Sequence, residues 1–280
     1  MLGVTCNRLY GQSSWWWEES SWMLLPFRPP DEYTHEPRSG SPSRLPAGPA
    51  FEPVGPLRVA TRRDFFSLAM NRVAFLVDGF NLYHSLRDAE GILGQGVKWL
   101  DLRSLLISYF HVIGGRPVLR DLRYFSALAH HRVTQDPAVT ERHKVYIRAL
   151  EARGTRVHLS RFKACKVVCK ICRQVFDRYE EKETDVALAV GILEALLNPE
   201  TDTVVLVSGD TDLVPALRTA RSGFPVKRLG IAFPYRRVSE EMKGLCDFYW
   251  RLKPQNYLTH QFPDPVQLGN GVTISKPSSW

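Results

Sequence analysis

Aspartate side chains recur in three short segments of the chain, two of which directly follow an apolar run. Asp78 lies in VDGFN, Asp185 lies in KETD, and Asp210 and Asp212 lie in SGDTD. Crowded carboxylates repel one another, so such a group shifts its pKa or binds a cation. Mg²⁺ and Mn²⁺ take oxygen ligands and bridge to phosphate oxygens. The pattern predicts a phosphoryl-transfer site in which Asp78, Asp185 and Asp210 hold Mg²⁺ or Mn²⁺.

Two of the segments stand where a buried strand is expected to end. The run 73–77 is apolar, rich in β-branched residues and stopped by Asp78, while the run 204–207 stops just before Ser208 and Asp210. Such runs are typical of strands buried on both faces of a parallel sheet. Ligands bind to open parallel sheets where the strands end and the chain turns into a helix. We therefore expect the aspartates to lie on one edge of a sheet.

The third segment opens an expected helix. Thr184 is the expected N-cap of an apolar helix that runs to residue 197, which would place Asp185 in its first turn. Structural roles remain open at this stage, because the helix dipole already favours an acid there and Asp212 could cap a helix that runs to Ser222. The four aspartates together favour the functional interpretation over the structural one.

Other polar residues in the same segments are candidates for binding substrate. Asn81, Ser208 and Thr211 could donate hydrogen bonds to a phosphate or position a carboxylate, and Lys182 could attract the phosphate. Asp212 is expected to orient a water molecule or a second ion. These assignments complete the predicted catalytic set of Asp78, Asp185, Asp210 and Asp212.

Three stretches, FLVDGFNLYHS, EEKETDVALAV and VLVSGDTDLVPAL, together resemble the NYN domain, the LabA-like branch of the PIN-like nucleases. The resemblance extends from about Asn71 to Leu252. It implies a PIN-like three-layer α/β fold, in which helices flank a central, mostly parallel sheet, and a metal-dependent ribonuclease activity. The four aspartates would correspond to the acidic cluster of that family. Many PIN-like nucleases carry a further acidic residue between the first aspartate and the one on the helix, and the sequence does not place it here.

Two other functions remain open. A haloacid-dehalogenase-like phosphatase usually carries a second aspartate two residues after its nucleophile, but Phe80 occupies that position here. A non-catalytic RNA-binding regulator could keep the same fold and bind RNA without cleaving it, and the sequence does not decide this case.

The chain divides by composition into one domain with extensions. Residues 1–69 contain no lysine and many prolines, so they are expected to be disordered or to be a translated upstream region, with Met70 as the true start. The nuclease domain is expected over 70–253, with a cysteine-containing loop at 163–182 and a C-terminal tail at 254–280. Expected strands are 72–78, 121–128, 155–162, 203–208 and 225–232. Expected helices begin at Asn81 and cover 101–112, 137–153, 185–197, 212–222 and 238–247.

Charge favours a polyanionic partner. The net charge is +8, and residues 1–69 contain as many arginines as acids, so the excess belongs to the predicted domain. Cations beside an acidic metal site suit RNA, or single-stranded DNA, because they bind the backbone phosphates. The candidate cations are Arg161, Lys163, Lys166, Lys170, Arg236, Arg237 and Lys243. A homo-oligomer is also compatible with the sequence.

The cysteines allow a second kind of metal site. Cys165, Cys169 and Cys172 form a C-x3-C-x2-C pattern that could hold a structural zinc ion, although a fourth ligand is not evident. Five cysteines without a regular framework favour a reducing cytoplasm. No apolar run is long enough to span a membrane, and we reject export through the Arg62-Arg63 pair because the apolar stretch after it becomes the first strand.

Overall fold

The computed structural model describes residues 70–169, 171–269 and 271–280, so the predicted extension 1–69 and Lys170 lie outside the described residues. In the described part of the chain, residues 70–169 and 175–280 belong to one compact unit, which contains the strands and helices named below. Among the described residues, no helix combines the length and apolar character that crossing a membrane requires.

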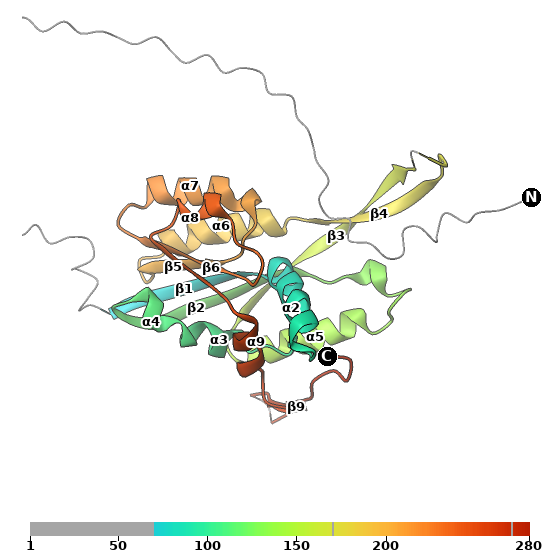
Figure 1. Cartoon of the computed structure of the whole chain (residues 1–280), viewed down its shortest axis with the longest axis horizontal. Helices are drawn as coiled ribbons and strands as arrows, with labels where there is room; N and C mark the ends of the chain where they lie inside the picture. Colours follow the sequence, from blue (N-terminus) through green and yellow to red (C-terminus); the bar gives the residue numbers. More distant parts are fainter. Residues whose placement is uncertain (1–69, 170, 270) are drawn as a thin grey trace, which may run out of the picture. The chain divides into compact units, whose positions relative to one another are not determined.

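Seven strands in the described part of the chain form one sheet, in the order β4-β3-β2-β1-β5-β6-β7 (Figure 1). Strand β4 runs antiparallel to β3, and the other neighbouring strands are parallel. The strands are β1 (Met70–Asp78), β2 (Arg116–Ala127), β3 (Arg156–Val168), β4 (Val175–Lys182), β5 (Thr203–Val207), β6 (Arg228–Phe233) and β7 (Phe248–Arg251).

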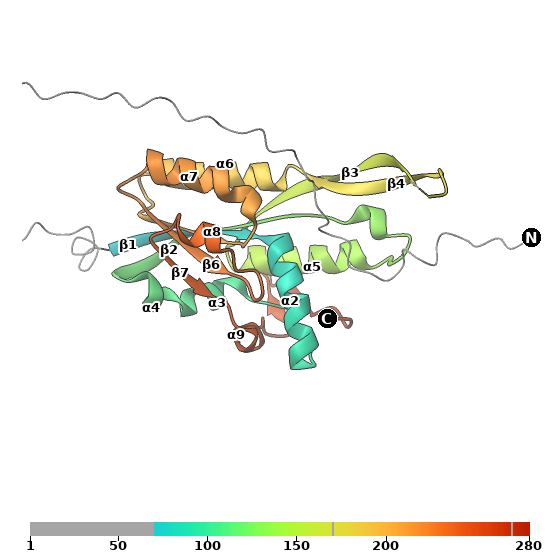
Figure 2. The same cartoon turned by 45° about the horizontal axis from the view of Figure 1, so that its top comes forward.

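Helices cover both faces of this sheet, with α6, α7 and α8 on one face and α2, α3, α5 and α9 on the other (Figures 1 and 2). Successive side chains of a strand point to opposite faces. Val73, Phe75 and Val77 accordingly join one core, whereas Ala74 and Leu76 join the other. The helices are α2 (Gly79–Leu93), α3 (Leu102–Ser108), α4 (Phe110–Ile113), α5 (Val139–Ala152), α6 (Thr184–Leu197), α7 (Val214–Gly223), α8 (Glu240–Lys243) and α9 (Pro254–Thr259), with 3₁₀ turns η2 (His130–Arg132) and η3 (Thr211–Leu213). These layers confirm the predicted PIN-like α/β fold.

The order of the strands reverses between β1 and β5. From β1 the chain adds β2, β3 and β4 on one side, and then returns to place β5 on the other side of β1. The loops that leave β1 and β5 therefore diverge toward opposite faces of the sheet. Ligands bind in open α/β sheets at such a reversal, outside the carboxyl ends of the strands. Asp78 ends β1 and Ser208 follows β5, so the fold places both predicted segments at this reversal.

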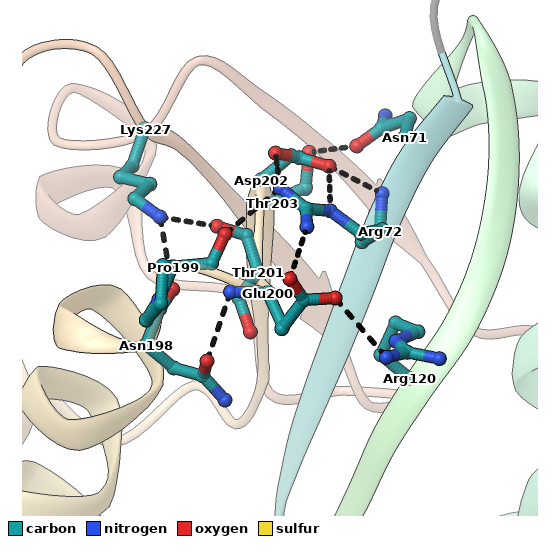
Figure 3. Close-up of polar contacts among 10 residues, drawn as sticks. All are labelled: Asn71, Arg72, Arg120, Asn198, Pro199, Glu200, Thr201, Asp202, Thr203 and Lys227. Atoms are coloured by element: carbon teal, nitrogen blue, oxygen red, sulfur yellow. Dashed lines mark hydrogen bonds and ion pairs between the residues drawn. The ribbon is translucent and has the colours of Figure 1, made fainter.

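A polar network fixes the opposite ends of the same two strands (Figure 3). The Arg72 guanidinium donates two hydrogen bonds of 2.8 Å to the Asp202 carboxylate, which also accepts the backbone N–H of Arg72. Arg72 also forms an ion pair with Glu200 at 3.0 Å. The buried Thr203 hydroxyl donates to Asn71 Oδ1 at 2.7 Å. Side chains thus pair the start of β1 with the start of β5 and set the register that brings their carboxyl ends together.

Several expected elements differ from the observed ones. The helix expected at 101–112 is divided at Tyr109 into α3 and α4, and the helix expected at 238–247 is reduced to the single turn α8. The cysteine-containing segment expected as a loop at 163–182 is instead mostly the hairpin of β3 and β4. Many hairpin side chains are exposed on both faces, so the strands lack the apolar alternation by which a half-buried strand is recognised.

The C-terminal segment 254–280, expected as a tail, packs against the core. Tyr257 is fully buried on α9, and Phe262 is 4% exposed. The Tyr257 hydroxyl forms a hydrogen bond of 2.8 Å with Ser85 Oγ and accepts the Tyr235 backbone N–H at 3.1 Å. The segment therefore contributes apolar contacts and hydrogen bonds to the folded domain.

We expect Tyr257→Ala to lower the free energy of unfolding by about 4 kcal/mol, because it removes a buried ring and leaves a cavity. Tyr257→Phe should cost about 1 to 3 kcal/mol, because it leaves the partners of the hydroxyl unpaired. Urea denaturation measures both changes. Leu197→Ala is the control, since that leucine is 69% exposed at the end of α6. Equal stability of wild type and Tyr257→Ala would show that the segment is not part of the cooperative core.

Candidate functional site

Asp78 lies at the carboxyl end of β1, where it is 4% exposed. Its Oδ1 accepts the backbone N–H of Asn81 at 2.9 Å, which caps the N-terminus of α2. Its Oδ2 accepts the Ser208 hydroxyl at 2.8 Å. The two hydrogen bonds fix the carboxylate in one orientation while leaving lone pairs on both oxygens for a further ligand.

The loop after β5 is tied to the loop after β1. The Ser208 hydroxyl, which donates to Asp78, also accepts the backbone N–H of Asp210 at 3.0 Å. The backbone N–H of Gly209 donates to Asn81 Oδ1 at 3.1 Å. Asn81 and Ser208, which we predicted to bind phosphate or position a carboxylate, are therefore observed joining the two loops. Asp210 in turn accepts the Asp212 backbone N–H at 3.0 Å and is the N-cap of η3. The helix that Asp212 could have capped, α7, instead has Leu213 as its N-cap.

Position 209 requires glycine, because the backbone of Arg237 lies too close to leave room for a side chain. A Cβ at this position would lie 1.6 Å from the carbonyl oxygen of Arg237. We expect Gly209→Ala to displace the loop and with it Asp210, because the atom in the way is backbone. The free energy of unfolding should fall by about 2 kcal/mol, and any activity of the site should fall with it.

The matched control for Gly209→Ala is Gly223→Ala in α7, where a Cβ would meet nothing within 4 Å. This variant should be as stable as wild type or slightly more so, because alanine restricts the unfolded chain. Thermal unfolding compares the two, and equal melting temperatures would contradict the assigned role of Gly209.

Helix α6 brings a third carboxylate. Asp185 lies in its first turn, as expected, but the N-cap is Glu183, which adopts a left-handed φ of 80°. Thr184, the expected cap, is instead the first helical residue, and its buried hydroxyl has no hydrogen-bond partner among the described residues. Partial burial raises the pKa of Asp185, and the charges of Asp210 and Asp212 raise it further.

Glu181 is a site residue that the sequence did not predict. It lies near the end of β4, opposite Phe162 of β3. Burial raises its pKa to about 7, and the charges of Asp185, Asp78 and Asp210 contribute in that order. Its Oε1 is buried without a hydrogen-bond partner in the described part of the chain. In the sequence, the only indication of a role for Glu181 was its position in the acidic run EEKETD. The pairing of β4 with β3 is needed to show which of these acids faces the aspartates.

Together these side chains form the acidic cluster, which consists of Asp78, Glu181, Asp185, Asp210 and Asp212. Burial raises the pKa of Asp78 to about 6, against the effect of its hydrogen bonds from Asn81 and Ser208. The charges of Asp210 and Asp185 raise it as well. Carboxylates that raise the pKa of one another in this way would be stabilised by a bound cation.

The cluster is not arranged as a set of direct metal ligands. Within residues 70–169, 171–269 and 271–280, no three His, Cys, Asp or Glu side chains converge closely enough to hold a metal ion. An ion at the acidic cluster would therefore be bound partly through water or after side-chain rotation, as Mg²⁺, which retains several waters, commonly is. The zinc site at Cys165, Cys169 and Cys172 stays a prediction.

Of the other two predicted substrate-binding residues, only Lys182 points away from the cluster. Lys182 forms an ion pair with Glu180 at 2.9 Å, and its neighbour Glu181 points to the other face of the hairpin. Thr211 is exposed in η3, between Asp210 and Asp212.

Three of the candidate cations contact neighbouring side chains. Arg237 forms an ion pair with Asp88 at 2.9 Å, and the Arg236 guanidinium lies 5.5 Å from the ring centre of Tyr235. Arg161, on β3, forms an ion pair with Glu183 at 2.7 Å and keeps a 76% exposed side chain.

The sequence is similar to the sequences of two other proteins. 6-Hydroxy-3-succinoylpyridine 3-monooxygenase HspA of Pseudomonas putida is 25% identical over 242 residues, which cover 75% of each chain. An uncharacterized protein of Methanocaldococcus jannaschii is 33% identical over 67 residues, covering 24% of this chain and 28% of the other. A crystal structure of a protein of unknown function from Vibrio parahaemolyticus aligns with a TM-score of 0.42 and 18% identity, over 65% of this chain and 93% of that one.

The family model of the NYN domain matches residues 72–252, which include the sheet, helix α6 and every member of the acidic cluster. NYN domains are PIN-like nuclease domains. The match covers more than half of the chain and agrees with the fold and with the position of the aspartates at the carboxyl ends of β1 and β5. The chain therefore belongs to the NYN domain family.

Proposed function

We propose that this protein is a metal-dependent ribonuclease that hydrolyses phosphodiester bonds of RNA at the acidic cluster. The observation that carries the proposal is the convergence of five carboxylates from β1, β4, α6 and the loop after β5. Acids that destabilise one another at the ligand-binding edge of a sheet favour a functional role over a structural one. A structural site would instead pair them with arginine or lysine.

The residues present fit a hard divalent cation, Mg²⁺ or Mn²⁺. All the donors are carboxylate oxygens, and the buried Oε1 of Glu181 has no partner among the described residues. Asp78, Asp185, Asp210 and Glu181 would hold the ion, partly through water or after side-chain rotation. When bound, the ion would lower the pKa of a water molecule and neutralise charge that develops on the phosphate.

The protein's own side chains would position this chemistry. Ser208 and Asn81 hold the loops after β1 and β5 together, so the carboxylates keep their spacing as substrate binds. Asp212 is exposed beside Asp185, where it would orient the attacking water by accepting a hydrogen bond from it. Positioning of this kind lowers the barrier because the reacting groups need no further ordering.

The basic residues of the hairpin favour RNA as the substrate. Lys163 and Lys166 are exposed on β3, and the exposed Arg161 lies on the same strand nearer the acidic cluster. Cations along the approach to an acidic site attract the backbone phosphates of a polynucleotide, and their effect weakens as salt increases. Single-stranded DNA would satisfy the same charges and therefore belongs in the test.

The test is cleavage of end-labelled RNA and of single-stranded DNA by the full chain, with Mn²⁺ or Mg²⁺ against EDTA. We expect metal-dependent cutting of RNA by wild type and its loss in Asp210→Asn. Asp264→Asn is the matched control, because this exposed aspartate lies outside the acidic cluster and asparagine can still accept the Lys276 N–H. RNA that is bound with no metal-dependent cutting would favour the non-catalytic RNA-binding regulator instead. If Asp210→Asn still cut RNA as wild type does, the acidic cluster would have no role in the mechanism.

A further inference from the structure

A hollow of about 280 Å³ lies between η2 and the hairpin of β3 and β4. Its lining residues are Leu128, His130, His131, Leu159, Ser160, Arg161, Phe162 and Tyr179. At about 30 Å³ per water, this space corresponds to roughly nine water molecules, which is enough room for one nucleobase. The hollow is distinct from the acidic cluster, none of whose members lines it.

The walls of the hollow are suited to a flat aromatic group. The His131 ring stacks on Tyr179 with 4.7 Å between ring centres and an angle of 12°, and it lies 4.4 Å from the Phe162 ring. The Tyr179 side chain remains 38% exposed and Leu159 48% exposed, so apolar surface is available to a ligand.

Polar atoms that line the hollow can form hydrogen bonds with the edge of such a group. The buried His131 Nδ1 has no hydrogen-bond partner in the described part of the chain. Burial lowers the pKa of His131 and so favours the neutral ring, which carries one hydrogen-bond donor and one acceptor. Arg161 and Ser160 add donors to the lining. Apolar walls with a few polar groups are the usual composition of a small-ligand site.

The hairpin connects this hollow to the acidic cluster. Residues directly opposite in an antiparallel pair share a face, and alternate residues of one strand share a face. Phe162 lies opposite Glu181, and Tyr179 lies two residues before Glu181, so all three side chains occupy one face of the hairpin. Phe162 also meets Phe80, the neighbour of Asn81 in the motif after β1, edge to face at 5.9 Å. A group held in the hollow would therefore lie close to the acidic cluster.

We propose that the hollow between η2 and the β3–β4 hairpin binds one unpaired nucleobase of the RNA, stacked against Tyr179, His131 and Phe162. This inference rests on the proposed ribonuclease function and adds to it a site for one unpaired base outside the acidic cluster. A base within a duplex is stacked on its neighbours and cannot enter the hollow. Stacking on aromatic side chains suits any base, because every base has a π face, and the polar atoms of the hollow would add a preference for one base. The hollow would thus position a strand for cleavage.

The experiment measures the affinity of the full chain for a labelled RNA oligonucleotide in EDTA, where the proposed cleavage cannot occur. We expect single-stranded RNA to bind more tightly than the matched duplex. Tyr179→Ala should weaken single-strand binding roughly tenfold, whereas Tyr179→Phe, which retains the ring, should bind like wild type. Tyr249→Ala is the matched control, because Tyr249 is 47% exposed on β7 at the opposite edge of the sheet.

An abasic scan of the oligonucleotide identifies the bound base. Removing one particular base should weaken binding to wild type by a similar factor and should have no further effect on Tyr179→Ala. The proposal is overturned if Tyr179→Ala binds like wild type, if no single base matters, or if duplex RNA binds as tightly. A base-dependent effect without metal-dependent cutting would support the hollow and refute the ribonuclease; cutting without that effect would refute the hollow alone.

Discussion

Asp78→Asn should reduce metal-dependent RNA cleavage about a thousandfold while leaving the domain folded. Asparagine keeps an oxygen for the backbone N–H of Asn81, and its amide replaces the oxygen that accepts the Ser208 hydroxyl. The charge that would hold the cation is lost, and about 4 kcal/mol of transition-state stabilisation corresponds to about a thousandfold in rate. Single-turnover cleavage of labelled RNA under saturating Mn²⁺ measures the change.

Unfolding experiments on Asp78→Asn separate a catalytic role from a structural one. Because a nearly fully buried charge is removed, the free energy of unfolding in EDTA should stay the same or rise. Asp78→Ala should be less stable than Asp78→Asn, because alanine leaves the α2 N-terminus without its cap and leaves no polar group beside Ser208. Cleavage by Asp78→Asn near the wild-type rate would refute the proposed role, and a fall in its stability equal to that of Asp78→Ala would make the residue structural.

The second large effect is a pH dependence of stability in the metal-free protein. The pKa of Asp78 is raised from 3.8 to about 6, and that of Glu181 from 4.5 to about 7. The folded protein therefore holds these protons more tightly than the unfolded chain does. Between about pH 4 and 7 the folded state binds more protons, so the free energy of unfolding should fall as the pH rises through this window.

The size of this effect follows from the buried Asp78. A shift of about two pKa units corresponds to about 3 kcal/mol, and the carboxylates share it because they titrate as a coupled set. Urea denaturation in EDTA at several pH values measures the fall. The free energy of unfolding of Asp78→Asn should fall less steeply with pH than that of wild type. Subtracting the two curves cancels the contribution of other titrating groups, such as Asp202, whose pKa is lowered by Arg72.

Divalent ions should reverse the destabilisation at pH 7. Mn²⁺ at a hundred times its dissociation constant would add about 2.7 kcal/mol, or roughly 5 to 10 °C in melting temperature. Glu181→Gln should reduce this gain, whereas Glu151→Gln, at an exposed position of α5, should not. The cation proposal would be contradicted if Mn²⁺ left the melting temperature of wild type unchanged.

The sequence alone predicted the central part of the fold and most of the acidic cluster. The apolar runs that became β1 and β5 are buried on both faces, and such runs are recognisable without knowledge of their neighbours. Asp78 directly follows the first run and Asp210 lies three residues after the second, so their place at the carboxyl edge of a parallel sheet followed from chain order and topology. The position of Asp185 in the first turn of α6 likewise followed from local sequence.

Only the tertiary structure decided the remaining features of the site. Glu181 joins the aspartates because β4 pairs antiparallel with β3, and this pairing is long-range and lacks an apolar alternation. The hollow beside Tyr179 depends on η2 lying against that hairpin. The buried Tyr257 likewise reaches Ser85 on α2, far away in sequence. Burial raises the pKa values in the cluster, and so do neighbouring charges, several of them from residues distant along the chain such as Asp210 beside Asp78. A local pattern therefore specifies the aspartates but not the environment that acts on them.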